Sequence, residues 1–375
     1  MRSADDVRWM RRALALATRG LGETNPNPVV GCVVVRSGRA VGEGWHERAG
    51  GPHAEVVALT GAGDRARGAT LYVTLEPCAH HGRTPPCAPL VRASGVSRVV
   101  AALVDPSPLV GGKGLRLLRG AGLAVTTGVL GEEAARLNDR FLVAARSPYP
   151  FVLLKAGLTL DGRIATAGRR SKWITSPAQR RQARWLRRLH DAVLVGIGTV
   201  LADDPRLLPV PATRRPFSRV VLDADLRLPV ASRLVRSAGA STPVVALAGR
   251  PPAARRRRLE RSGVEVLTVP ASGGRLSLPH ALAALRERGI ASVMVEGGSE
   301  VLGSFLAARL VDQVALFRAP LLLGGRGSFS AFGGDDPASI DDALRLRPVP
   351  DVPPFPWPAP PRFELWAPDR RRRRG

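Results

Sequence analysis

The sequence reads His53-Ala54-Glu55, then Glu76-Pro77-Cys78, and Cys87 follows after an insert of eight residues. His53, Cys78 and Cys87 are ligand types that Zn²⁺ prefers, and three protein ligands leave a fourth position for water. Bound zinc lowers the pKa of that water to about 7, so the water can attack a carbon atom at neutral pH. Glu55 can then carry the proton from the water to a leaving amine. The pattern predicts a catalytic zinc site.

A structural zinc site is the alternative interpretation of this motif. His80, His81 or Cys32 would then supply a fourth ligand and close the site to water. A closed site does not explain Glu55, so we favour the catalytic interpretation. Cys32 alternates within a β-branched run, and this pattern predicts a small buried side chain or one that lines the pocket.

The residues around the motif alternate between helical and strand patterns. Residues 4–19 have helical spacing, with Asp5 and Asp6 where the helix dipole favours negative charge. Strands are expected at 29–35 and 40–45, on either side of a Ser37-Gly38 turn. The alternation predicts a layered α/β domain. The further expected elements are a helix from about 53, a strand at 69–75, a helix from about 86, a strand at 98–103, a helix near 115 and a helix at 132–146.

A second alternation starts after the linker-like residues 147–150. It begins with a strand from Phe151, and residues 176–190 have the pattern of a helix. Proline is so frequent between 348 and 361 that it excludes helix and central strand, while residues 362–366 could form a last edge strand. We therefore expect domains at 1–146 and 149–367, with a basic, disordered tail at 368–375. The other expected elements are a strand at 192–196, strands at 219–222, 243–247, 292–295 and 313–317, and helices at 279–288 and 300–308.

The composition narrows the classes of protein. The net charge is +25, but only three of the 56 basic residues are lysines (Lys113, Lys155 and Lys172), and the arginines are spread throughout the chain. Aromatic residues make up 5 % and show no spacing for base stacking, so nucleic-acid binding is not expected. No apolar run is long enough for a membrane helix, and the first residues lack a signal-peptide pattern. We therefore expect a cytoplasmic protein. Three cysteines are too few to cross-link a chain of this length, and ligand or catalytic roles fit them better than disulfides.

Further motifs extend the pattern over nearly the whole chain, which resembles the bifunctional riboflavin-biosynthesis deaminase/reductase family. The eight-residue insert between Cys78 and Cys87 is similar to that of these enzymes, whereas deaminases in general have two residues there. The other similar motifs are Asn25-Pro26-Asn27-Pro28-Val29-Val30-Gly31, Gly44-Trp45-His46, Asp105-Pro106-Ser107-Pro108, Gly112-Lys113-Gly114, Lys155-Ala156-Gly157, Ser171-Lys172-Trp173, Gly198-Thr199 with Asp203-Asp204-Pro205, and Glu296-Gly297-Gly298.

The resemblance implies an α/β fold with a cytidine-deaminase-like three-layer domain, followed by a dihydrofolate-reductase-like domain. It implies zinc-dependent deamination of 2,5-diamino-6-ribosylamino-4(3H)-pyrimidinone 5′-phosphate. NADPH-dependent reduction of the ribosyl side chain to ribityl would follow. Asn27 and His46 would hold the pyrimidine, with Arg83 near the ribose phosphate. The implied partner is a small pyrimidine nucleotide, and a homo-oligomer is compatible with the sequence.

In the second half, a glycine turn at Glu296-Gly297-Gly298 follows a buried strand and opens a helix, where backbone amides can hold phosphate. By form alone it is either a cofactor site or a tight turn. The resemblance implies that Lys155 lies near the ribose carbon that accepts hydride. It assigns contacts with the ribosylaminouracil phosphate, the substrate of the reduction, to Ser171, Arg187, Leu207 and Glu296. It assigns NADPH to Gly157, Trp173, Thr199, Asp203, Gly298, Ser299, Glu300, Val301, Leu302, Gly303 and Ser304.

Three positions depart from the family pattern. Ser107 stands where Asn is usual, and Ala224 stands where a small hydroxyl residue is frequent. Residues 208–211 read Leu-Pro-Val-Pro where a basic substrate contact is expected, with Arg206, Arg214 and Arg215 as candidate substitutes. The alternatives are therefore an enzyme with an impaired reductase half, a deaminase of nucleosides or tRNA, or a basic zinc-binding adaptor without catalysis.

Overall fold

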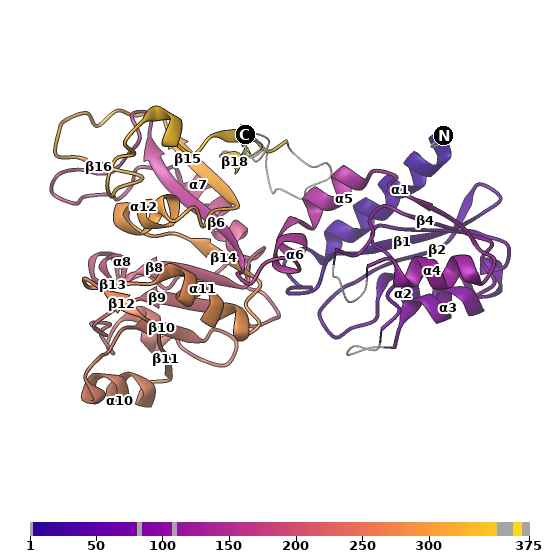
Figure 1. Ribbon diagram of the computed structural model, residues 1–375, viewed down its shortest axis with the longest axis horizontal. Helices are drawn as coiled ribbons and strands as arrows, with labels where there is room; N and C mark the ends of the chain where they lie inside the picture. Colours follow the sequence, from indigo (N-terminus) through magenta and orange to yellow (C-terminus); the bar gives the residue numbers. More distant parts are fainter. Residues whose placement is uncertain (1–2, 81–84, 107–110, 351–362, 370–375) are drawn as a thin grey trace. The chain divides into compact units, whose positions relative to one another are not determined.

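The computed structural model describes residues 3–80, 85–106, 111–350 and 363–369. These residues form two compact units, one comprising 3–147 and the other 148–350 together with 363–369 (Figure 1). In the described part of the chain, no helix combines the length and apolarity that crossing a membrane requires. Arg83, His81, Ser107 and the end of the expected tail, 370–375, lie outside the described residues.

A five-stranded sheet forms the centre of the first unit, in the order β2-β1-β3-β4-β5. The first three strands of this order pair antiparallel, and β3, β4 and β5 pair parallel. The strands are β1 (Gly31–Arg36), β2 (Arg39–Trp45), β3 (Thr70–Val73), β4 (Arg98–Ala101) and β5 (Ala124–Thr127). The helices are α1 (Ala4–Ala17), α2 (Ala54–Ala62), α3 (Cys87–Ala93), α4 (Lys113–Gly120), α5 (Gly131–Leu137) and α6 (Asp139–Ala144), with short 3₁₀ turns η1 (Thr18–Gly20) and η2 (Gly63–Ala66).

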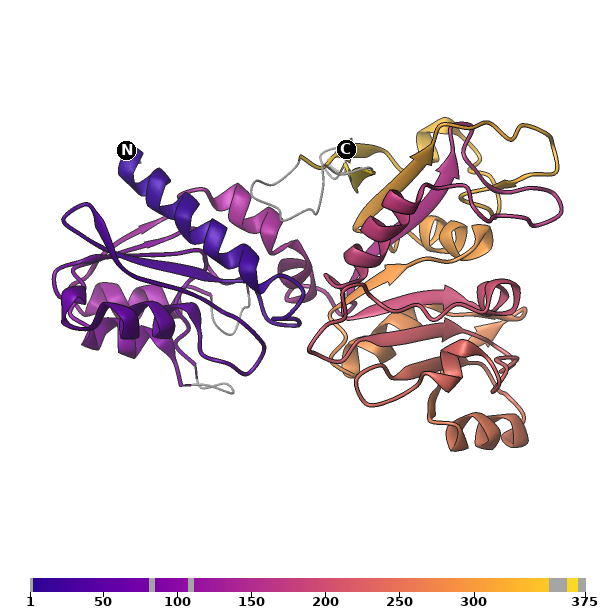
Figure 2. The same ribbon diagram turned by 180° about the vertical axis from the view of Figure 1, so that it is seen from behind.

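Alternate residues of β1 point to opposite faces of this sheet and create two cores. Val34 packs with α2, α3 and α4 in one core, whereas Val33 and Val35 pack with α1 and α5 in the other. Figure 2 shows α1 lying across its face of the sheet. The first unit therefore has the expected three layers, helices–sheet–helices.

A nine-stranded sheet forms the centre of the second unit, in the order β11-β10-β9-β8-β14-β6-β15-β18-β17. The pairs from β11 to β15 are parallel, and the pairs of β18 with β15 and β17 are antiparallel. The strands of this sheet are β6 (Phe151–Thr159), β8 (Ala192–Gly196), β9 (Ser218–Leu222), β10 (Val244–Ala248), β11 (Val264–Thr268), β14 (Ser292–Val295), β15 (Gln313–Ala319), β17 (Leu346–Pro348) and β18 (Glu364–Pro368). Two small ladders pair β7 (Arg163–Ala165) with β16 (Phe329–Ser330) and β12 (Ala271–Ser272) with β13 (Arg275–Leu276).

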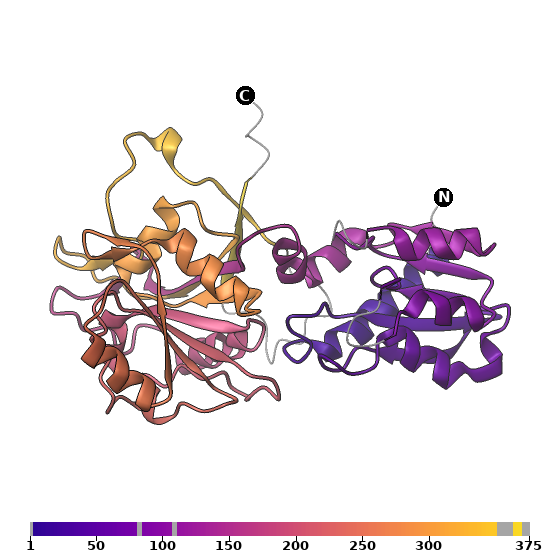
Figure 3. The ribbon, with the colours of Figure 1, turned by 60° about the horizontal axis from the view of Figure 1, so that its bottom comes forward.

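Helices cover both faces of the second sheet as well. Leu194 of β8 faces a core with α11 and α12, while its neighbours Val193 and Val195 face α8, α9 and α10. Helix α10 lies beside the edge strand β11 (Figures 1 and 3). The helices are α7 (Pro177–Arg187), α8 (Ile197–Asp203), α9 (Arg233–Arg236), α10 (Ala253–Arg261), α11 (Leu278–Glu287) and α12 (Ser299–Ala307), with the 3₁₀ turn η3 (Ile340–Asp342).

Several features differ from the sequence-based expectation. The expected helix at 132–146 is broken at Asn138, because the side-chain amide of this residue bonds the backbone of Val29 instead of facing solvent. The last strand is not an edge strand, because β17 pairs along its outer side. Strand β5 and helix α10 were not expected. The first has only one large apolar residue, Val125, and the second only Leu259.

Candidate active sites

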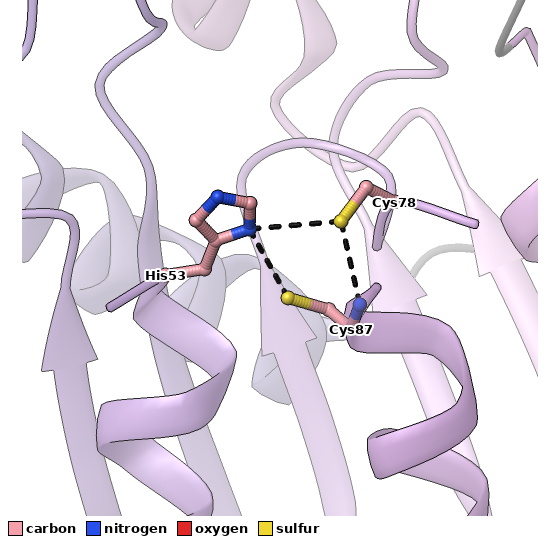
Figure 4. A group of neighbouring side chains, drawn as sticks. All are labelled: His53, Cys78 and Cys87. Carbon is pink, nitrogen blue, oxygen red and sulfur yellow. Dashed lines mark hydrogen bonds between the residues drawn. The ribbon is translucent and has the colours of Figure 1, made fainter. Parts of the chain in front are cut away.

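Three ligand-type side chains meet at the ends of the first sheet's elements. His53 is the N-cap of α2, Cys87 is the first residue of α3, and Cys78 follows β3. The Nδ1 atom of His53 lies 3.2 Å from Cys87 Sγ and 3.6 Å from Cys78 Sγ (Figure 4). All three ligand atoms lie within 4.8 Å of one another. The structure thus brings together the three residues that the sequence motif nominated.

These distances fit a tetrahedral zinc ion. With about 2.0–2.1 Å to nitrogen and about 2.3 Å to sulfur, tetrahedral ligands lie roughly 3.5 Å apart. Hydrogen bonds from the Cys87 thiol and from His53 lower the pKa of Cys78 to about 4, despite partial burial. The pKa of Cys87 is raised by its hydrogen bond to Cys78 and by burial. The contacts between Cys78, Cys87 and His53 therefore already stabilise the thiolate of Cys78. A zinc dication at this place would favour the thiolate form of both cysteines.

Glu55 lies beside the cluster without belonging to it. It is the second residue of α2 and is buried, and burial raises its pKa to about 7. A carboxyl group that titrates near neutrality can both accept and return a proton, as a general acid/base must. Among the described residues the ligand cluster has three members, with neither His80 nor Cys32 in it. Of the fourth ligands considered, His80 and Cys32 are thus outside the cluster and His81 lies outside the described residues, while the buried Glu55 beside the cluster favours the catalytic interpretation.

A cavity of about 340 Å³ opens onto the cluster and is lined by Asn27, His46 and Glu55. His46 Nδ1 donates to the carbonyl of Pro52 (3.0 Å), so Nε2 accepts from Asn27 Nδ2 (3.3 Å). Burial lowers the pKa of His46, which keeps the ring neutral. Asn27 and His46 therefore present a fixed polar edge to a ligand, as expected for residues that hold a pyrimidine. Cys32 is fully buried and does not line this cavity.

Two buried polar residues that shape this cavity were not nominated from the sequence. Asn138 accepts from Val29 N (2.8 Å) and donates to Val29 O (3.0 Å), and so fixes the segment that follows Asn27. Glu76 lines the cavity and accepts backbone hydrogen bonds from residues 105–115. Its position directly before Pro77-Cys78 could have indicated a role near the zinc ligands. Its hydrogen-bond partners could not be predicted, because they depend on the tertiary fold.

A second cluster lies at the carboxyl edge of the nine-stranded sheet. Glu296 follows β14, Lys155 is in the neighbouring strand β6, and Arg187 ends α7. Arg187 contacts both carboxylate oxygens of Glu296, at 2.5 and 3.0 Å, and Lys155 Nζ lies 3.6 Å from Oε2. Arg187 also donates to the carbonyl of Leu208 (2.9 Å). In open α/β sheets this edge is where ligands bind.

The charges of this cluster depend on one another. Burial raises the pKa of Glu296, but the charges of Arg187 and Lys155 outweigh it and bring the pKa to about 2. Burial lowers the pKa of Lys155, while the carboxylate of Glu296 raises it. The pKa of Lys155 is thus lowered overall, mainly by burial, and an amine with a lowered pKa beside a carboxylate is a candidate donor to a reacting oxygen.

The residues expected at the cofactor frame the same edge. Thr199 and Asp203 are in α8, which follows β8, and residues 299–304 are in α12, which follows β14. Asp203 pairs with Lys172 Nζ at 2.9 Å. Gly298 caps α12 without a side chain, and a Cβ built there would have no atom within 4 Å. The N-terminus of α12 offers backbone N–H groups of the kind that can hold the phosphates of a dinucleotide.

Several other nominated residues have distinct environments. Gly157 is in β6, and Trp173 is 68 % exposed, with the Arg180 guanidinium over its ring. Ser171 lies in the loop just before it. The Leu207 side chain is buried in the core, so a contact from this residue would come from its backbone.

One candidate substitute for the missing basic contact is already engaged. The guanidinium of Arg215 pairs with Asp191 (3.3 Å) and donates to the carbonyls of Arg188 and His190. Its side chain is only 9 % exposed. Arg215 therefore supports the fold through these bonds, and its use as a substitute substrate contact stays a prediction.

Together the fold and the two clusters define the class of protein, a zinc-dependent deaminase joined to a dihydrofolate-reductase-like reductase that uses NADPH. Residues 3–103 match the cytidine and deoxycytidylate deaminase zinc-binding region, and residues 150–349 match the RibD C-terminal domain. The chain belongs to the RibD family.

Relatives and solved structures agree over both units. The riboflavin biosynthesis proteins RibD of Aquifex aeolicus and of Escherichia coli K12 are each 44 % identical to the chain. The alignments cover 91 % and 85 % of the chain, and 94 % and 89 % of those proteins. The structure of Acinetobacter baumannii RibD (form 1) matches with a TM-score of 0.85 at 37 % identity, covering 97 % of this chain and 99 % of that one. A deaminase/reductase from Thermotoga maritima matches with a TM-score of 0.82 at 36 % identity and the same coverage. The sequence-based assignment to this family is confirmed.

Proposed function

We propose that the chain catalyses two consecutive steps of riboflavin biosynthesis on one pyrimidine nucleotide. The first is hydrolytic deamination of 2,5-diamino-6-ribosylamino-4(3H)-pyrimidinone 5′-phosphate, and the second is NADPH-dependent reduction of its ribosyl group to ribityl. The observation that carries this proposal is the open His53–Cys78–Cys87 cluster with Glu55 beside it, in one chain with the Lys155–Glu296 pair. We assign deamination to residues 1–146 and reduction to residues 149–367.

In the deamination step, zinc bound to His53, Cys78 and Cys87 would make water acidic at neutral pH. Glu55 accepts a proton from the water as its oxygen bonds to ring carbon C2. Glu55 then gives that proton to the exocyclic nitrogen, the C–N bond breaks and ammonia leaves. Asn27 and His46 hold the ring, and Arg83 binds the ribose phosphate.

In the reduction step, bound NADPH would supply the hydride for C1′ of the ribosyl group. The bond between C1′ and the ring oxygen breaks, and Lys155 gives its proton to that oxygen. The carboxylate of Glu296 raises the pKa of Lys155 against the effect of burial, and so favours the protonated amine. We place the nucleotide substrate of this step near Ser171, Arg187, Leu207 and Glu296. We place the cofactor against Gly157, Trp173, Thr199, Asp203 and residues 298–304.

The proposal implies a small nucleotide as partner and no nucleic acid. It also implies a compartment in which thiolate ligands stay reduced. All three cysteines are free, in keeping with a cytoplasmic enzyme.

An anaerobic assay with the diaminopyrimidinone nucleotide, with and without NADPH, tests the proposal. We expect stoichiometric ammonia release in both cases, and NADPH oxidation to follow when the cofactor is present. Ammonia release without NADPH oxidation would identify an enzyme with an impaired reductase half. Release from cytidine or tRNA instead would identify a different deaminase, and no release from any substrate would favour an adaptor.

A further inference from the structure

Glu76 is a buried carboxylate between the first sheet and the zinc ligand Cys78. It is 4 % exposed, and its own N–H donates to the carbonyl of Leu103 (2.9 Å). Its Oε2 accepts from the backbone N–H groups of Asp105 (3.1 Å) and Gly112 (2.9 Å). Its Oε1 accepts from Gly114 (2.9 Å) and, at 3.4 Å, from Leu115. One side chain thus ties the strand end before Cys78 to a segment about 30 residues further along the chain.

The bonding of Glu76 differs from that of an ordinary buried acid. Within the described ranges no basic side chain forms an ion pair with it, so backbone N–H groups alone compensate its charge. Most of these donors belong to α4 or its N-cap. A neutral amide could not replace the carboxylate fully, because one of its two ends would present N–H groups to N–H groups.

A close backbone contact reinforces this connection. A Cβ built on Gly114 would lie 1.9 Å from the carbonyl oxygen of Pro77, so α4 packs directly on the backbone between Glu76 and Cys78. Glu76, Cys78 and Asp105 all line the 340 Å³ cavity that contains Glu55. The carboxylate therefore sets the distance between the cavity wall at Asp105 and the zinc ligands.

We propose that Glu76 is a positioning residue for the deamination step, an inference that rests on the proposed function. It acts through the backbone at Asp105 and Gly112, which it holds against the segment that carries Cys78. Its removal displaces the cavity wall that the pyrimidine contacts and leaves the zinc ligands and Glu55 in place. The effect falls on substrate affinity more than on turnover.

The test compares Glu76→Gln with Asp6→Asn, measured on the full-length zinc-loaded protein. Asp6 is a matched control because it is also buried and hydrogen-bonded, to Arg98 and Tyr72, but it does not line the cavity. We expect both variants to lower the Tm. Only Glu76→Gln should raise the KM of deamination, by about tenfold or more, with zinc content and NADPH-dependent reduction of the deaminated nucleotide unchanged.

Amide hydrogen exchange supplies a readout that is independent of activity. We expect Glu76→Gln, but not Asp6→Asn, to speed exchange at the amides of Asp105, Gly112 and Gly114. Glu76→Asp keeps the carboxylate on a shorter side chain. Its KM should therefore lie between the values for the wild type and for Glu76→Gln.

Three results would overturn the inference. These are an unchanged KM in Glu76→Gln, an equal rise in Asp6→Asn, or loss of zinc from Glu76→Gln. The wild-type protein tests the proposed function separately, because absence of ammonia release there would refute the function whatever the variants do.

Discussion

The zinc cluster and the Lys155–Glu296–Arg187 cluster assemble their charged groups in different ways. His53 and Cys87 are 34 residues apart, and each lies where a helix begins, so short motifs place them. Arg187 and Glu296 are 109 residues apart, and the cluster depends on β14 lying between β8 and β6 in the correct register. The first site is specified by local sequence and ligand chemistry, and the second by sheet topology. The two sites should therefore respond differently to single substitutions.

The largest effect is expected for Glu55→Gln. The amide cannot carry the proton from water to the leaving amine, so ammonia release should fall by at least about 10²–10⁴-fold. The ligands His53, Cys78 and Cys87 are unchanged, so zinc stoichiometry should stay at the wild-type value. NADPH-dependent reduction of the deaminated nucleotide should also be preserved, because it belongs to the other unit. Substantial residual deamination would remove Glu55 from the general acid/base role, and loss of zinc would show that it helps to build the metal site.

A second large effect is expected for Lys155→Arg, which preserves charge but not size. Lys155 is nearly buried, next to Glu296 and over the Phe317 ring, and a guanidinium is larger and does not give up its proton. NADPH oxidation should fall by at least about tenfold, roughly 1.4 kcal/mol of barrier. Ammonia release should continue, so the deaminated nucleotide accumulates.

Lys172→Arg is the matched control for that variant. Lys172 is half-exposed in its pair with Asp203, so arginine can keep the ion pair and reduction should be little changed. Equal rates of NADPH oxidation in wild type and Lys155→Arg would show that Lys155 only lines the strand. Loss of both activities in Lys155→Arg would indicate misfolding.

The sequence predicts features that depend on local motifs better than features that depend on sheet topology. The ligands of the zinc site could be predicted because His, Cys and Glu at these spacings have few other uses, and the layers because helical and strand periods alternate. The residues that support the sites could not be predicted. Asn138 looks like a helix residue until Val29 is known to lie beside it, and the four donors to Glu76 become neighbours only after β3 and β4 pair.

The reductase half shows the same limit more strongly. Family resemblance assigned Lys155 to catalysis, and Arg187 and Glu296 to contacts with the substrate. Nothing local in the sequence indicates that they form one charge network, because this depends on parallel pairing in which Val295 lies beside Leu154. Leu207 was nominated as a contact residue although its side chain belongs to the core, since one sequence does not distinguish a backbone contact from a side-chain contact.

The charge network predicts a shift in pH dependence for Glu296→Gln. The carboxylate raises the pKa of Lys155, whereas burial and the charge of Arg187 lower it. Without the carboxylate the pKa of Lys155 falls, and the ammonium loses its proton at a lower pH. The alkaline limb of the NADPH oxidation profile should therefore move to lower pH by at least about one unit. The pH profile of ammonia release should not move, and a coincident shift of both profiles would contradict a network confined to the second site.

The smallest expected effect tests whether a departure from the family pattern weakens the second site. Ala224 lines a cavity of about 200 Å³ together with Ser304 and Val301 of α12, at the edge where the cofactor is placed. A hydroxyl at this position adds one hydrogen bond, worth about 0.5–1.5 kcal/mol. Ala224→Ser should therefore lower the Kd of NADPH, measured by titration of the free protein, by roughly two- to tenfold. Ala224→Val, which adds side-chain volume without a hydroxyl, is the control and should not tighten binding. If Ala224→Ser leaves the Kd unchanged, other groups already make the hydrogen bonds that the cofactor needs at this place. The second site would then tolerate substitution at position 224, as expected for a site whose contacts come from many separate parts of the chain.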